Sequence, residues 1–143
     1  MTKVGKVSSL FYSPPSGRTT ACSFDLDSQG ILDDKHYKKD IERSVLIASL
    51  ESYALANHHD IELVHGVLGE NILIDYNPYH LIAGSRLKIG KVTFEISQPC
   101  TLCKSLTKID SKLPKLLKND RGIFAKVMGI GSIKEGDEIY LLD

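Results

Sequence analysis

The sequence predicts a mainly β protein whose strands form a closed or nearly closed barrel with a few helical insertions. Three observations lead to this prediction. Most apolar residues fall in short runs of strand character, glycine turns separate these runs, and only one long segment carries an apolar stripe at helical spacing. Strands and helices do not alternate regularly, which argues against a repeated β-α-β unit. An open α+β sheet is the alternative architecture.

The first two strands are expected near the N-terminus. Residues 3–13 (KVGKVSSLFYS) are rich in valine and aromatic side chains, and the run ends at Pro14 and Pro15, which cannot donate to a sheet ladder. Residues 18–27 (RTTACSFDLD) alternate less regularly and predict a weaker strand. The polar residues 27–36 (DSQGILDDKH) then predict a loop.

One helix is predicted from Glu42 to Ala56 (ERSVLIASLESYALA), because good helix formers there place apolar side chains along one stripe. The following residues 60–76 (DIELVHGVLGENILIDY) contain β-branched side chains interrupted by Gly66 and Gly69. This pattern predicts short strands around a tight turn.

The C-terminal half is expected to begin with a hairpin in residues 85–97 (SRLKIGKVTFEIS), whose turn lies at Gly90 and Lys91. Residues 105–119 predict two short helical pieces, because Pro114 either breaks the helical run or lies in a first turn that begins near Asp110. Residues 121–143 alternate again and predict strands joined by a turn.

Length and charge limit the classes of function. A chain of 143 residues predicts one domain, residues 1–143, large enough for its own core. The 18 basic and 18 acidic side chains cancel, so no overall field would hold nucleic acid or an anionic membrane. No signal peptide or membrane-spanning run is evident, and the odd number of cysteines, three, predicts a cytoplasmic protein with reduced thiols.

Cys100 and Cys103 form a C-x-x-C pair directly after a predicted strand. Such a pair serves as a zinc half-site, a redox dithiol, a pair of small buried residues or the anchor of a soft-metal cofactor. Zinc is disfavoured, because no second pair of ligands stands at a suitable spacing among the five histidines. The other three interpretations remain open at this point.

Two polar segments are candidates for a binding site. In GENILI, Glu70 and Asn71 stand at the lip of a predicted strand, where an amide can bind a heterocycle or simply close the turn made at Gly69. In GILDDKH, the residues Asp34, Lys35 and His36 precede Arg43 at the start of the predicted helix. Lys35 and Arg43, together with helix N-terminal amides, can cradle a phosphate, although a solvated loop with an ordinary helix cap gives the same pattern.

In chain order these segments resemble the MOSC domain, the family named for the C-terminal domain of molybdenum cofactor sulfurase. The resemblance rests on GILDDKH and RSVLI, then LGENILI, then LIAGSRLKIGKVTFEISQPCTLC, and finally RGIFAKVMGIGSIKEGDEIYLL. It implies a β-rich barrel with a molybdopterin-type molybdenum cofactor in a cleft.

The resemblance also implies roles for individual residues. Members with one cysteine after the SQP stretch have it at the position of Cys103, so Cys103 is the expected metal ligand and Cys100 the alternative. Asn71 matches a family position at the cofactor. The remaining residues expected to bind the cofactor are Arg43, Lys35, His36, Asp34 and Glu70.

The sequence departs from the family pattern in one loop position. The family loop reads G-D-x-H, whereas this chain has Asp33 in place of the glycine. Aspartate adopts left-handed backbone angles less easily than glycine, so the geometry of the loop is in question. The chain also lacks the additional N-terminal barrel of the reductase members.

The expected function is binding of the molybdenum cofactor through a cysteine thiolate. The protein would act as a carrier or insertion factor, or as a small oxidoreductase with an external reductant. Expected partners are a reductase, a cofactor-biosynthesis protein or an acceptor protein. The alternatives are a sulfur-transfer protein with a cysteine persulfide, and a non-catalytic interaction module.

Overall fold

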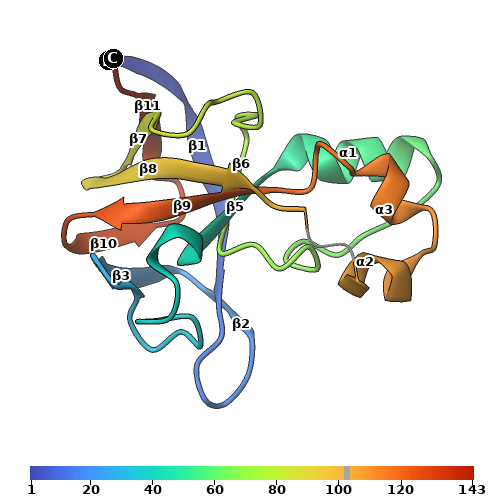
Figure 1. Cartoon of the computed structure of the whole chain (residues 1–143), viewed down its shortest axis with the longest axis horizontal. Coiled ribbons are helices and arrows are strands. Elements are labelled where there is room, and N and C mark those ends of the chain that lie inside the picture. Colours follow the sequence, from blue (N-terminus) through green and yellow to red (C-terminus); the bar gives the residue numbers. More distant parts are fainter. Residues whose placement is uncertain (102–103) are drawn as a thin grey trace.

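Strands close into a barrel in the computed structural model, which describes residues 1–101 and 104–143 (Figure 1). Within these residues, seven strands follow one another around the barrel in the order β11-β7-β8-β9-β5-β6-β1, and pairing of β1 with β11 closes it. The predicted barrel is therefore confirmed. The seven strands are β1 (Thr2–Tyr12), β5 (Val45–Ser49), β6 (Ile72–Ile74), β7 (Arg86–Ile89), β8 (Val92–Pro99), β9 (Ile123–Met128) and β11 (Glu138–Leu141).

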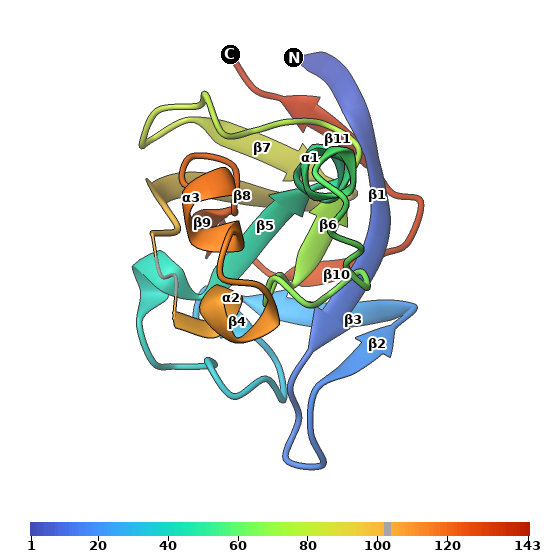
Figure 2. The same ribbon diagram turned by 90° about the vertical axis from the view of Figure 1, so that its right-hand side faces the viewer.

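The other described elements are four short strands and a few short helices, which surround this barrel. β2 (Thr19–Ala21) pairs with β1 outside the closed ring, and β3 (Ser23–Asp27), β4 (Gly30–Ile31) and β10 (Gly131–Lys134) form a small second sheet. Figure 2 shows the helices gathered at one end of the barrel. They are α1 (Leu50–His58), α2 (Lys104–Ile109) and α3 (Leu113–Leu116), with a single 3-10 turn, η1 (Ile41–Arg43), elsewhere. No helix of the described residues is long and apolar enough to cross a membrane.

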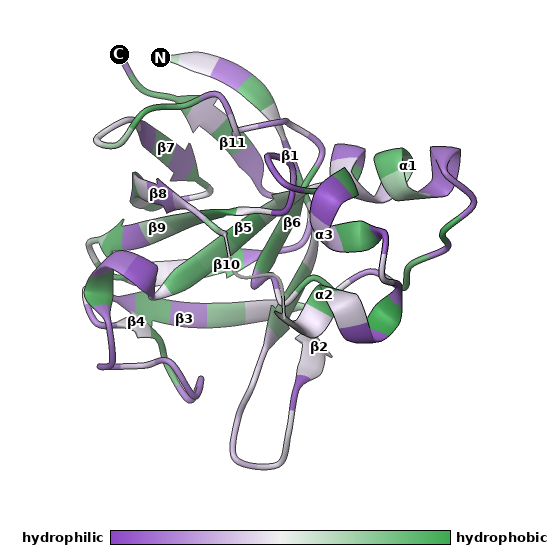
Figure 3. Ribbon diagram, turned by 45° about the vertical axis from the view of Figure 1, so that its right-hand side comes forward, coloured by the Kyte–Doolittle hydropathy of each residue, from purple (hydrophilic) through white to green (hydrophobic). Residues whose placement is uncertain are grey.

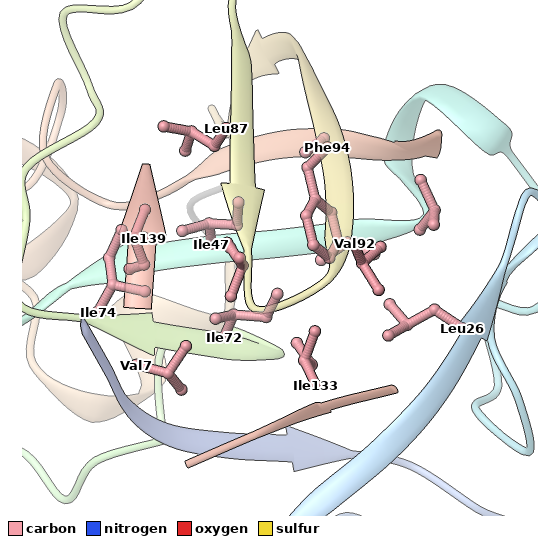
Figure 4. Close-up of a cluster of buried hydrophobic side chains, with 14 of the residues drawn as sticks. Val7, Leu26, Ile47, Ile72, Ile74, Leu87, Val92, Phe94, Ile133 and Ile139 are labelled. Carbon is pink, nitrogen blue, oxygen red and sulfur yellow. The ribbon is translucent and has the colours of Figure 1, made fainter. Parts of the chain in front are cut away.

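The barrel interior is filled by alternate side chains of its strands (Figure 4). In β8, for example, Val92, Phe94 and Ile96 are buried, while the residues between them are partly exposed. This alternation is what a sheet with one face in the core requires. Leu26 and Ile133 of the small sheet pack against the same cluster, so the second sheet covers part of the barrel core.

The helix predicted for Glu42–Ala56 is wrong in its first half. Val45–Ser49 forms β5, all five residues of which are buried, and the helix starts only at Leu50. β5 pairs in parallel with β6 and antiparallel with β9, and Figure 3 shows β5 and β6 as mostly hydrophobic. A strand buried on both faces has no polar alternation, so its sequence resembles that of a buried helix.

The remaining element predictions are confirmed in part: residues 27–36, predicted as a loop, contain the two-residue strand β4 (Gly30–Ile31). The hairpin of residues 85–97 appears as β7 and β8, with Gly90 at a φ of +59° in the turn. Only Ile72–Ile74 of residues 60–76 is a strand, so the prediction of several strands there is wrong. Two helical pieces, α2 and α3, are present as predicted, and Pro114 lies in the first turn of α3, whose N-cap is Lys112.

Candidate functional site

A cavity of about 200 Å³ lies where the ends of several barrel strands meet the predicted binding loops. It brings together six predicted site residues from separate parts of the sequence: Asp34, Lys35, His36, Arg43, Asn71 and Cys100. A more open groove of about 720 Å³ adjoins the cavity and shares Ser13, Arg18, Asp34 and Lys35 with it. Of the other predicted residues, Glu70 is fully buried and does not line the cavity, and Cys103 lies outside the described residues.

Asp34 fixes the loop on one side of the cavity. Its side chain is almost completely buried, and its Oδ1 accepts a hydrogen bond from the backbone N–H of Ser13 at 2.7 Å. Its Oδ2 accepts from the backbone N–H of His36 at 3.0 Å and lies 3.4 Å from His36 Nδ1. The Asp34 carboxylate is thus used to join the loop to the end of β1.

The pKa of Asp34 is lowered by this arrangement. Burial by itself would raise the pKa, but the hydrogen bonds from the side chain and backbone of His36 and from the Ser13 backbone outweigh burial. The carboxylate is therefore charged at neutral pH. Its charge partly offsets the cations of the cavity.

Asp33, which stands where the resemblance led us to expect glycine, has a φ of +67°. The loop therefore has a left-handed residue here, and aspartate adopts that conformation against the steric preference of its Cβ. Since Asp33 is exposed, replacing its side chain disturbs no core contact.

We expect Asp33→Gly to raise the free energy of unfolding by about 0.5 kcal/mol, the relief of strain being partly offset by the greater freedom of glycine in the unfolded chain. Urea unfolding measures this change. Lys39→Gly is the matched control, because Lys39 is an exposed residue of the same loop without a positive φ. Lys39→Gly should destabilise the protein, and stabilisation by both variants would contradict the strain at Asp33.

Asn71 connects three strands at the lip of the cavity. Its Oδ1 accepts from the backbone N–H of Leu46 at 3.0 Å, and its Nδ2 donates to the carbonyl of Phe11 at 3.2 Å. Its own backbone N–H and carbonyl bond the same two residues. Asn71, which directly precedes β6, therefore links the β6 start to both β1 and β5. The same residue lines the cavity.

Arg43 lies in η1 and its guanidinium stacks over the Phe124 ring, 5.3 Å from the ring centroid. With the amide of Gln98 oriented to accept, Arg43 Nε and Nη2 donate to it at 2.9 and 3.2 Å. Because α1 starts seven residues later, the prediction that helix N-terminal amides join Arg43 in an anion cradle is wrong. The cation itself is held in place by Phe124 and Gln98.

Two arginines that the sequence did not single out as site residues also line the cavity. Arg18 Nη2 donates to the carbonyls of Gly66 and Glu70 at 2.8 and 2.5 Å, and Arg121 Nη1 donates to that of Leu68 at 2.8 Å. The alternate carbonyls of residues 66, 68 and 70 thus hold both guanidiniums at the cavity wall. Arg121 is buried and also bonds Ser105 of α2, at 3.3 Å. The sequence signal that could have identified Arg121 is its place at the start of the RGIF motif.

The cavity is therefore cationic and contains a thiol. Among the described residues that line the cavity, Asp34 is the one carboxylate beside four cations, Arg18, Lys35, Arg43 and Arg121. Fixed guanidiniums bind oxyanions well. Cys100 is free and buried, and it packs with Leu46 and Phe124. Within residues 1–101 and 104–143, no three His, Cys, Asp or Glu side chains are grouped to hold a metal ion. A ligand suited to this cavity carries negative charge.

The comparisons with known proteins agree on the fold. A family model described as MOSC domain matches residues 32–140, and a search of curated proteins found no match. The YuaD protein of Bacillus subtilis has a similar structure, with a TM-score of 0.81 and 19% identity over 95% of this chain and 94% of that one. YiiM of Escherichia coli also has a similar structure, with a TM-score of 0.74 and 18% identity over 96% of this chain and 70% of that one.

Proposed function

This protein belongs to the MOSC domain family, and from that premise we propose that its cavity binds the molybdopterin form of the molybdenum cofactor. The observation that carries the proposal is the set of four cationic side chains, Arg18, Lys35, Arg43 and Arg121, around one small cavity. The chain has no net charge, so this cluster is a local feature and not part of a generally basic surface.

The residues of the site suit such a cofactor. The arginines and Lys35 would hold the phosphate end, and the guanidiniums are already fixed by carbonyls and by Phe124, so little side-chain freedom is lost on binding. A cysteine thiolate is a soft donor that suits a metal with sulfur ligands. We propose Cys103 for that role and Cys100, which lines the cavity, as the alternative.

The bound group would supply a redox-active metal. The protein would supply orientation, charge neutralisation and a wall of Leu46, Leu68 and Phe124 against water. In this proposal the protein is a carrier or insertion factor, or a small oxidoreductase that takes electrons from a separate reductase. Partners would be that reductase, or proteins that deliver or accept the cofactor.

The proposal is tested by the metal and pterin content of protein made in a host supplied with molybdate. We expect near-stoichiometric molybdenum and pterin in the wild type, and loss of both in Cys103→Ser if the thiolate anchors the metal. Cys100→Ser is the matched control, expected to retain the cofactor. Absence of pterin from the wild type would contradict the proposal, and loss in Cys100→Ser alone would transfer the ligand role to Cys100.

Sulfur transfer is a second candidate, favoured by the free thiol of Cys100 in a cationic cavity. In this function a thiolate attacks the sulfane sulfur of a donor persulfide, so the protein gains the persulfide and the donor returns to a thiol. Intact-mass measurement of metal-free protein after incubation with a persulfide donor would show one added sulfur atom. An unchanged mass would exclude this candidate.

A further inference from the structure

Glu70 has a buried carboxylate that contacts no ligand in the proposed function. Its side chain is fully buried, and Oε2 accepts a hydrogen bond of 2.5 Å from the hydroxyl of Tyr53. Among the described residues, no donor is within hydrogen-bonding distance of Oε1. A buried charge with one unbonded oxygen is costly unless a cation compensates it.

The compensating cation is Arg18 of the cavity wall. Arg18 Nη2 lies 3.9 Å from Glu70 Oε1 and also donates to the carbonyls of Gly66 and Glu70. The same guanidinium stacks over Phe11, 5.3 Å from the ring centroid. Arg18 borders both the cavity and the adjoining groove.

Tyr53 connects this ion pair to the loop that carries the carbonyls. Its hydroxyl accepts from the backbone N–H of Gly66 at 2.9 Å while it donates to Glu70. Gly66 has a φ of +96°, and a Cβ there would lie 2.7 Å from an atom of the Phe11 ring. The loop therefore approaches Phe11 and Arg18 closely only because residue 66 is glycine.

We propose that Glu70 is a positioning residue, which acts through Arg18 to hold one guanidinium edge towards an anion in the cavity. This inference rests on the proposed function in so far as the cavity takes an anionic ligand. It assigns Glu70 a role different from cofactor contact, because the side chain is covered by Arg18 and Tyr53.

The proposal makes a prediction whose sign opposes simple electrostatics. Glu70→Gln removes a negative charge near the cavity, and the field alone would then favour anion binding. If Glu70 positions Arg18, the variant should instead bind inorganic phosphate about tenfold more weakly, equivalent to about 1.4 kcal/mol. Isothermal titration of cofactor-free protein with phosphate at fixed ionic strength measures the dissociation constants.

Variants at Arg18 show whether Glu70 acts through it. Arg18→Gln should weaken phosphate binding, and Glu70→Gln should have no further effect in the Arg18→Gln background. The proposal is overturned if Glu70→Gln binds phosphate as tightly as the wild type or more tightly. It is also overturned if Glu70→Gln weakens phosphate binding in the Arg18→Gln background as much as it does in the wild type. Failure of the wild type to bind phosphate overturns it as well.

A further variant covers the case in which Glu70→Gln does not fold. Tyr53→Phe leaves the charge of Glu70 in place but removes the hydroxyl that orients it, so weaker phosphate binding supports positioning and unchanged binding overturns it. Protein that lacks pterin but shows the coupling between Glu70 and Arg18 would refute cofactor binding and leave this inference standing. The experiments therefore distinguish failure of the cofactor-binding proposal from failure of the positioning role of Glu70.

Discussion

Replacing Asn71 with alanine is expected to lower the free energy of unfolding by about 2–4 kcal/mol, because two buried backbone groups lose their partners. The N–H of Leu46 and the carbonyl of Phe11 are both bonded by the Asn71 side chain. Since these groups belong to β5 and β1, the change also loosens the lip of the cavity. Chemical unfolding in urea, followed by circular dichroism, measures the loss.

Asn57 provides the control for this prediction. It is an exposed residue near the end of α1, so Asn57→Ala should change the free energy of unfolding by less than about 0.5 kcal/mol. If Asn71→Ala were equally neutral, the side-chain bonds to Leu46 and Phe11 would contribute nothing to stability. Asn71 would then be important for ligand contact alone.

Asp34→Ala is expected to destabilise the protein by about 2–4 kcal/mol at neutral pH, because it leaves the N–H groups of Ser13 and His36 without their charged acceptor. Exposed Glu62 provides the control, and Glu62→Ala should be close to neutral. A small effect of Asp34→Ala would mean that the loop is held by its other contacts, such as the bond from Lys35 N–H to the Ser13 carbonyl at 2.9 Å.

The stabilisation from Asp34 should depend on pH in a defined direction. Because the folded protein lowers the pKa of Asp34, the carboxylate stabilises the fold above the unfolded-chain value of about 4. This contribution is lost as the pH falls through the lower folded value. The stability difference between wild type and Asp34→Asn should therefore shrink on acidification below about pH 4, and a difference that grows there would contradict the lowered pKa.

The fold was predictable where one face of a strand is exposed, and less so where both faces are buried. The hairpin of β7 and β8 follows from alternating side chains and a glycine turn, and both strands were predicted. Val45–Ser49 was predicted as helix because a strand with neighbours on both edges and apolar surroundings on both faces shows no period of two. Ser49, which caps α1 by accepting from the N–H of Glu51, was the local signal for the later helix start.

The sequence predicted which segments form the candidate site, but not which contacts their side chains make. Lys35 was selected from a predicted loop, Arg43 from the start of a predicted helix and Asn71 from the lip of a predicted strand, and all three line one cavity. The selection missed Arg18 and Arg121, because their importance depends on carbonyls of residues 66–70 that only the folded chain brings near them. The same limit applies to Glu70, whose carboxylate is bonded by Tyr53, and to the bond that Asp34 accepts from the Ser13 N–H, although the other bonds of Asp34 come from nearby His36.

The pairing of β1 with β11 affects how the protein reaches its native state. Thr2 pairs with Leu141, so the ring closes only when two segments far apart in the sequence meet. The cavity draws residues from Ser13 to Phe124, and they too converge over long stretches of sequence. Contacts of this kind require large loop-closure entropies before they give stability, so folding should be slow for a chain of this length. Newly made protein would therefore spend longer with unpaired strand edges than a helical bundle would, which favours aggregation during synthesis.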